Sequence, residues 1–190
     1  MNIFGDSIIL RAIESDDVDV LHRWSNDPEV QQNLGGWHFP LSRASMHRWI
    51  DTFKYDGIDQ RFVIEGKGTG PVGLITLTNI NWKDRNAFHG VLIGEGRHRR
   101  KGFAEDAVRT IMRYAFEEMG LERLDTTIVE FNSASLKLHV DKCGWIEEGR
   151  KANAVFRKGK FWSLVILGAT RHASSSHLGK AKAVRIVAKR

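Results

Sequence analysis

The stretch Arg99-Arg100-Lys101-Gly102-Phe103-Ala104 lies between residues 87–94 (AFHGVLIG), typical of a β-strand, and the clearest helical pattern of the chain. A loop that enters a helix presents main-chain N–H groups without partners, and these groups attract anions. Gly102 can adopt conformations that other residues avoid, and the neighbouring basic side chains add positive charge. The stretch therefore suits a diphosphate, although a solvated basic loop before an amphipathic helix fits the same residues.

Two common phosphate-binding motifs are excluded here. The stretch is not a Walker loop, because no Gly-Lys-Ser/Thr follows, and it carries only one of the three glycines of a dinucleotide fingerprint. The helix that follows is indicated by apolar residues at helical spacing, and Gly120 is a suitable residue to end it. These apolar residues are Ala104, Ala107, Val108, Ile111, Met112, Ala115 and Met119.

The rest of the chain alternates between strand and helix patterns. It predicts strands at 7–13, 61–65, 72–80, 87–94, 123–130, 145–156 and 161–169. It predicts helices near 15–24, 42–53, 104–119 and 133–142, with N-caps at Ser15, Ser42 and Asn132 and a turn at Asn26-Asp27-Pro28. The fold class is therefore α/β of the α+β kind, with about seven strands and about four helices in the order β-α-α-β-β-β-α-β-α-β-β.

Composition limits the class of protein. A chain of 190 residues with 42% hydrophobic and 27% charged residues is typical of one globular domain. The single cysteine, Cys143, excludes an internal disulfide and a cysteine-based metal cluster, and buried packing is its simplest role. No apolar run reaches the roughly 18 residues of a membrane span, and the first residues lack a basic secretion signal. We therefore expect a cytoplasmic protein without a membrane partner.

The net charge of +6 belongs to the end of the chain. Residues 171–190 carry six basic residues and no acidic one, so residues 1–170 are electrically neutral. We expect a domain over 1–170 and a peripheral basic tail over 171–190. The basic tail is a weak argument for a nucleic-acid partner of the body, and we do not expect such a partner.

Three blocks of the sequence, in the expected order, resemble the GNAT N-acetyltransferases. Arg99, Gly102 and Ala104 fill that family's acyl-CoA-binding pattern, Q/R-x-x-G-x-G/A. The second block, 132–145, is similar to N-x-x-S/A…Y-x-K-x-G-F. The third, 148–161, looks like the closing hairpin of the RimJ/RimL-like and nucleotide-amino-sugar acetyltransferase branches.

This resemblance covers about residues 7–170 and implies the GNAT fold. That fold has a central mixed, mostly antiparallel, twisted sheet with splayed strands at the CoA site. The resemblance also implies acetyl-CoA as co-substrate and no metal. It places the pantetheine arm along the main chain of Val91, Leu92 and Ile93. The other implied cofactor-binding residues are Arg99, Arg100, Lys101, Gly102, Phe103, Ala104, Asn132 and Ser135.

The resemblance suggests where proton transfer takes place. His139 stands where many relatives carry a tyrosine, the presumed general acid, and an imidazole can also donate a proton. Packing within a helix is the alternative role. Relatives often carry a glutamate base where this chain has Thr127, so Glu130 and His89 become the candidates for holding a water that removes the amine proton. Either residue could instead have a surface or strand-packing role.

The acceptor is less well defined than the cofactor. Trp37, His38 and Trp82 are candidates for binding it, although they could equally form the cores of small loops. We expect an acyltransferase that moves an acetyl group directly to a primary amine. The amine would belong to a small molecule, with a nucleotide-linked amino sugar favoured, or to a protein N-terminus. Polyamines fit less well because the body is not acidic.

The sequence leaves a second class of function open. A non-catalytic acyl-CoA-binding module, or an RNA-associated module using the basic tail, would explain both the histidine at position 139 and the charge of 171–190. A homodimer is common in such folds, but no residue here demonstrates one.

Overall fold

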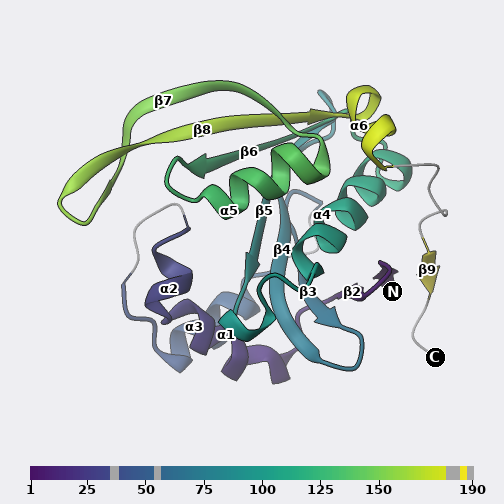
Figure 1. Ribbon diagram of the computed structural model, residues 1–190. Coiled ribbons are helices and arrows are strands. Elements are labelled where there is room, and N and C mark those ends of the chain that lie inside the picture. Colours follow the sequence, from purple (N-terminus) through teal and green to yellow (C-terminus); the bar gives the residue numbers. More distant parts are fainter. Residues whose placement is uncertain (35–38, 54–56, 179–184, 188–190) are drawn as a thin grey trace.

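The computed structural model describes residues 1–34, 39–53, 57–178 and 185–187. In this part of the chain, nine strands form one sheet in the order β7-β8-β6-β5-β4-β3-β2-β1-β9 (Figure 1). Neighbouring strands are antiparallel except for β5 and β6, which are parallel. The strands are β1 (Asn2–Phe4), β2 (Ile8–Arg11), β3 (Gln60–Gly66), β4 (Gly70–Asn81), β5 (Asn86–Ile93), β6 (Arg123–Val129), β7 (Ile146–Arg157), β8 (Lys160–Thr170) and β9 (Arg185–Val187).

Helices cover both faces of the sheet. The α-helices are α1 (Val18–Ser25), α2 (Pro28–Gln31), α3 (Arg43–Asp51), α4 (Phe103–Arg113), α5 (Ser133–Lys137) and α6 (Arg171–Leu178). Short 3₁₀ turns are η1 (Ser15–Asp17) and η2 (Gly96–His98), and π-helical turns η3 (Tyr114–Glu118) and η4 (Leu138–Lys142) extend α4 and α5. The larger apolar core lies under α4 and α5, and a smaller one joins α1 and α3 to the opposite face.

Side chains of β5 alternate between these two cores. Val91 and Ile93 pack into the core beneath α4, whereas Leu92 packs into the core of α1 and α3. Because side chains alternate along a strand, His89 shares the α4 face and Phe88 faces the other way. This alternation fixes which side chains of the sheet can meet each helix layer.

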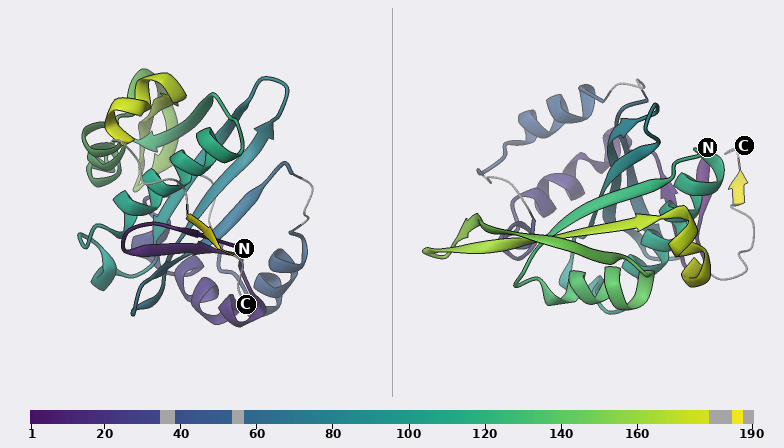
Figure 2. Two further views of the ribbon diagram at one scale, coloured as in Figure 1. Left: turned by 90° about the vertical axis from the view of Figure 1, so that its right-hand side faces the viewer. Right: turned by 90° about the horizontal axis from the view of Figure 1, so that it is seen from above.

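The sequence predicted all seven longer strands of the sheet. The two additional strands, β1 and β9, have three residues each, too few to show an alternating pattern. They pair with one another, with Ile3 opposite Ile186, so the chain returns to the edge where it begins. Figure 2 shows β9 beside β1, and the β7–β8 hairpin extending well beyond the body.

One local prediction near the N-terminus was wrong, and another was incomplete. Glu14, not Ser15, is the N-cap residue of η1, because it forms a reciprocal capping box with Asp17. The expected turn at Asn26-Asp27-Pro28 does end α1, which stops at Ser25, but Pro28 also begins the short helix α2. Asp27 accepts the N–H of Glu29 at 2.8 Å, and Pro28 supplies a helical φ at the first position. The predicted caps at Ser42 and Asn132 are confirmed.

The parallel strands β5 and β6 separate after a short paired segment. Their paired residues are Asn86 with Arg123, Ala87 with Leu124, and Phe88 with Asp125. Beyond Phe88, β5 stays bonded to β4 as far as Ile93, and β6 stays bonded to β8 as far as Val129. The strands therefore diverge with their facing edges unpaired, which is the splay predicted from the sequence.

The end of β5 is packed tightly against α1. A Cβ atom placed on Gly94 would lie 2.1 Å from the indole ring of Trp24, which is 2% exposed. Gly94 also donates its N–H to the carbonyl of Val72 in β4, so its backbone has little freedom to move. Only glycine at this position lets the ring lie against the main chain.

We predict that Gly94→Ala lowers the free energy of unfolding by about 1–3 kcal/mol, because the new methyl group forces Trp24 or β5 to shift. Urea unfolding of the purified protein measures this loss. Gly96→Ala is the matched control, since a Cβ there meets no atom within 4 Å. An equal change in stability for the two variants would contradict the tight packing at Gly94.

Candidate active site

The loop that enters α4 forms a concave set of main-chain donors. Arg100 and Gly102 both adopt left-handed backbone conformations, with φ of 62° and 82°. A Cβ on Gly102 would meet no atom within 4 Å, so the conformation, and not a lack of space, calls for glycine. Among the described residues, the amides of 100–105 donate to no acceptor, whereas that of Asp106 bonds to the Gly102 carbonyl. Such an arrangement binds anions.

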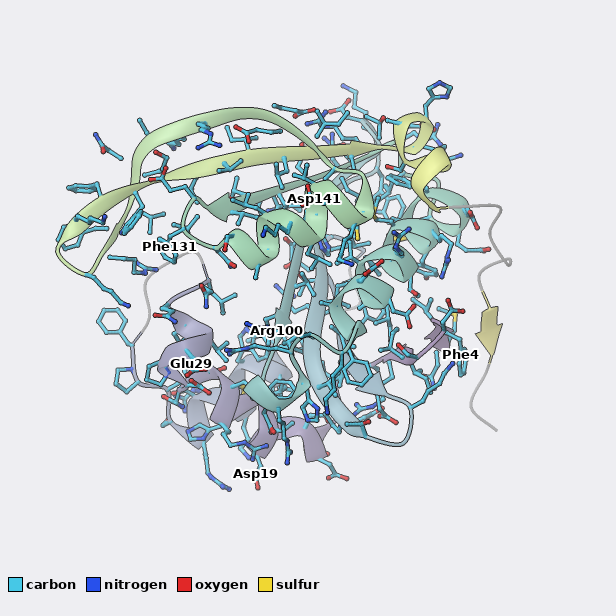
Figure 3. The ribbon with its side chains drawn as sticks, in the orientation of Figure 1. Phe4, Asp19, Glu29, Arg100, Phe131 and Asp141 are labelled. Atoms are coloured by element: carbon cyan, nitrogen blue, oxygen red, sulfur yellow. The ribbon has the colours of Figure 1, made fainter. Side chains whose placement is uncertain are left out.

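The side chains of this loop divide into paired and unpaired charges. The guanidinium of Arg99 lies 2.9 Å from the carboxylate of Glu29 in α2. Arg100 and Lys101 are exposed, and neither forms an ion pair with any residue that the structure describes. Figure 3 shows Arg100 in the middle of this face, with Glu29 to one side of it. Two positive charges therefore remain available beside the main-chain donors.

The unpaired edge of β5 continues the line of this loop. The N–H of Gly94 points to β4, where it bonds to the Val72 carbonyl. Since main-chain groups alternate along a strand, those of Val91 and Ile93 point away from β4 and toward the open side facing β6. A ligand lying along this edge can add to the sheet as a strand.

A cavity of about 480 Å³ adjoins the end of this edge. It lies between α1 and the loop after β5, and Trp24 and Gly94 contribute to its wall. Glu95, also in the wall, forms ion pairs with Arg23 at 2.9 Å and Arg97 at 2.6 Å. Local sequence pattern did not point to Trp24, Gly94 or Glu95 as residues of the site, although glycine at a strand end is a known sign of close backbone approach.

Two histidines and a tryptophan fill the space beneath the point where the strands separate. His89 and His139 are 0% and 2% exposed, and their ring centroids are 5.5 Å apart. The ring of Trp145 contacts both, at 5.4 Å from His89 and 5.2 Å from His139. The sequence proposed both histidines for catalysis, and the structure brings them together.

The hydrogen bond of His139 defines its tautomer. Its Nδ1 lies 2.8 Å from the carbonyl oxygen of Ser135, which can only accept, so Nδ1 carries the proton. Burial lowers the pKa of His139, which favours the neutral ring with a lone pair at Nε2. A neutral ring of this tautomer has no proton on Nε2 to donate, which argues against the expected acid role.

Burial lowers the pKa of His89 to about 3, and the charge of His139 contributes in the same direction. The Thr76 main chain lies near the ring and opposes this shift. It misses hydrogen-bond geometry, so both ring nitrogens lack a partner in the part of the chain that the structure describes. His89 is therefore neutral throughout the physiological range.

The other polar candidates are engaged in local structure. Glu130 accepts the N–H of Ser163 at 2.7 Å, so one of its carboxylate oxygens holds β8. Asn132 caps α5 by accepting the N–H of Ser135 at 3.2 Å, and its amide nitrogen reaches the carbonyl of Asn33 at 3.5 Å. These bonds place both side chains at the open end of β6.

The structure describes one of the three residues that the sequence predicted to bind the acceptor. Trp82 is 52% exposed and donates to the carbonyl of Gly57, but it follows β4 at the paired end of the splay, far from the open end. Trp37 and His38 lie outside the described residues. Cys143 is fully buried, as predicted, and burial raises the pKa of its thiol to about 12.

The described residues contain neither a membrane-spanning helix nor a metal-binding group of side chains. They contain no helix long and apolar enough to cross a membrane. They also contain no group of three or more histidine, cysteine, aspartate or glutamate side chains suited to a metal ion.

Comparison with known proteins agrees with this geometry. Residues 7–145 match the acetyltransferase (GNAT) domain family. The chain belongs to the GNAT family. It is 29% identical to the SPbeta prophage-derived N-acetyltransferase YokL of Bacillus subtilis, over 88% of this chain and 92% of that protein. It is 26% identical to a spermidine N(1)-acetyltransferase of Vibrio cholerae, over 83% and 89%.

The fold has close structural counterparts. The crystal structure of a Vibrio cholerae spermidine N-acetyltransferase in complex with CoA and spermine superimposes with a TM-score of 0.82. It covers 90% of this chain and 99% of its own, at 22% identity. The family and the mixed, mostly antiparallel fold predicted from the sequence are confirmed. This GNAT protein is an acyltransferase, and the comparisons give no support to the non-catalytic alternative.

We predict that His89 makes stability depend on pH. Its pKa falls from 6.5 to about 3 on folding, so the unfolded chain binds more protons below pH 6.5. Stability is therefore lost as pH falls from 6.5 toward 3, by about 2 kcal/mol at pH 5. His89→Leu removes this part of the pH dependence.

Urea unfolding at pH 7.5 and pH 5 measures the difference. His47→Leu is the control, because His47 is exposed on α3. If His89→Leu and the wild-type protein lose the same stability between these two pH values, the buried neutral state of His89 is wrong.

Proposed function

We propose that this GNAT protein binds acetyl-CoA along the splayed edge of β5 and transfers the acetyl group directly to a primary amine. One observation carries the proposal: the unpaired β5 edge leads into the concave loop of main-chain donors at the start of α4. The Vibrio cholerae spermidine N-acetyltransferase that was solved in complex with CoA shares this fold.

The residues present suit that co-substrate. The main-chain groups of Val91 and Ile93 would bond to the pantetheine arm, and the free amides of 100–104 would hold the diphosphate, with Arg100 and Lys101 balancing its charge. Acetyl-CoA supplies an acyl group activated as a thioester. The chain itself supplies position, charge and a route for protons.

The acceptor must lose a proton before it reacts. At pH 7 an amine with a pKa of about 10.4 is neutral about 0.04% of the time, whereas an α-amino group near 8 is neutral about 10% of the time. A lysine-like amine therefore gains more from a proton acceptor within the site.

For the acceptor, we favour a small molecule that carries negative charge, such as a nucleotide-linked amino sugar. The hairpin residues 149–162 include five basic residues and no acidic one. The carboxylates on the sheet face opposite α4 are already paired. Asp59 bonds to Arg61 at 2.6 Å, and Asp125 bonds to Arg123 at 2.6 Å.

A polyamine is the second candidate, favoured by the similarity to the spermidine N(1)-acetyltransferase of Vibrio cholerae. A polyamine needs carboxylates to bind its several cationic groups. In this chain Arg123 also engages Glu148, which leaves few free carboxylates on that face among the described residues. A protein N-terminus remains the third acceptor.

We predict that Lys101→Glu weakens acetyl-CoA binding at least tenfold, because a carboxylate replaces a cation beside the diphosphate. Isothermal titration calorimetry with acetyl-CoA measures the change. Lys83→Glu, in the exposed β4–β5 turn, makes the same charge change away from the loop and should bind normally. Equal affinities for both variants would contradict the site.

The acceptor is tested by thiol release over a panel of amines. The panel contains a nucleotide-linked amino sugar, spermidine and a peptide with a free N-terminus. We expect the highest kcat/KM for the nucleotide-linked amino sugar. A higher value for spermidine would overturn this choice of acceptor and leave the acetyl-CoA site intact.

A further inference from the structure

The two histidines beneath the splay have three buried ring nitrogens without partners among the described residues. These are Nε2 of His139 and both nitrogens of His89. A buried polar nitrogen without a hydrogen bond is costly, and native proteins keep few of them. Here they lie together in an otherwise apolar core, against Trp145, where β5 and β6 begin to separate. Such a cost at this place points to a role in the reaction.

We propose that His139 is the proton acceptor of this enzyme, through Nε2. The proposal rests on the proposed function, since it deepens that reaction. It reverses the acid role expected from the sequence, because the bond from Nδ1 to the Ser135 carbonyl leaves only a lone pair at Nε2.

In this step one proton moves from the acceptor ammonium to His139. The N–H bond of the acceptor ammonium breaks, and its proton forms an N–H bond at Nε2 of His139. The ammonium becomes a neutral amine, and the imidazole becomes an imidazolium whose Nδ1 proton still bonds to Ser135. The imidazolium then returns its proton to water, which restores the starting tautomer.

The surroundings explain why the pair holds one proton at a time. His139 is the only described group whose charge acts on the pKa of His89, and it disfavours a second proton there. No described charged group acts on the pKa of His139; burial lowers it, and the Ser135 carbonyl partly opposes that. Among the described residues, therefore, no carboxylate acts on the pKa of either ring.

The first test uses the free protein and needs no turnover. Nitrogen-15 NMR of labelled histidines reports the tautomer and the pKa of each ring. We expect His139 to be neutral at pH 7 with its proton on Nδ1, and to titrate below 6.5. A proton on Nε2, or a charged ring at pH 7, would overturn the proposal.

The second test is the pH–rate profile of His139→Phe with acetyl-CoA and the best amine of the panel. We expect kcat to fall at least 100-fold while the KM for acetyl-CoA changes less than threefold. The rate of the variant should rise tenfold per pH unit up to the pKa of the free amine, because water must now take the proton. The wild-type rate should level off near neutral pH.

Two controls keep the outcome decisive. His47→Phe makes the same change on the surface of α3 and should keep the wild-type profile. His89→Phe should lower kcat less than His139→Phe and leave the slope of its profile as in the wild type. If His139→Phe keeps the wild-type profile, this inference is wrong. If the wild-type protein binds no acetyl-CoA, the proposed function is wrong instead.

Discussion

The separation of β5 from β6 is the feature on which the rest of the site depends. Three residue pairs join the two parallel strands, and then each strand continues with its outer edge bonded and its inner edge free. Unpaired main-chain groups inside a sheet are unfavourable unless water or a ligand satisfies them. In the proposed function this free edge is the binding surface, and its position determines where a ligand meets the α4 loop and the histidine pair.

Main-chain and side-chain chemistry are divided between the two ends of this opening. At the open end, the left-handed conformations of Arg100 and Gly102 turn several amides toward one point. At the closed end, His89 and His139 occupy a buried apolar core, and no charged group among the described residues acts on the pKa of His139. Low polarity there favours neutral rings, and neutral imidazoles can accept protons. In the proposed function, the same sheet thus provides an anion-binding end and a proton-accepting end.

The sequence predicted what local pattern and composition control. Alternation gave the seven longer strands, and helical spacing with glycine and serine signals gave the main helices. The three-residue strands β1 and β9 escaped detection because their existence depends on pairing across the whole chain. For the site, the sequence proposed the loop and both histidines, but it could not give the tautomer of His139. That depends on a carbonyl in the preceding turn of helix. The packing of Trp24 on Gly94 and the bond from Glu130 to Ser163 were also beyond local pattern, since each joins distant segments.

Amide hydrogen exchange of the protein with and without acetyl-CoA tests the central claim most directly. If the free β5 edge and the α4 loop bind the co-substrate, exchange slows at Val91, Ile93 and 100–104, while the exposed hairpin residues near Lys158 exchange as before. Unchanged exchange at the edge and the loop, with protection in another part of the chain, would contradict the account.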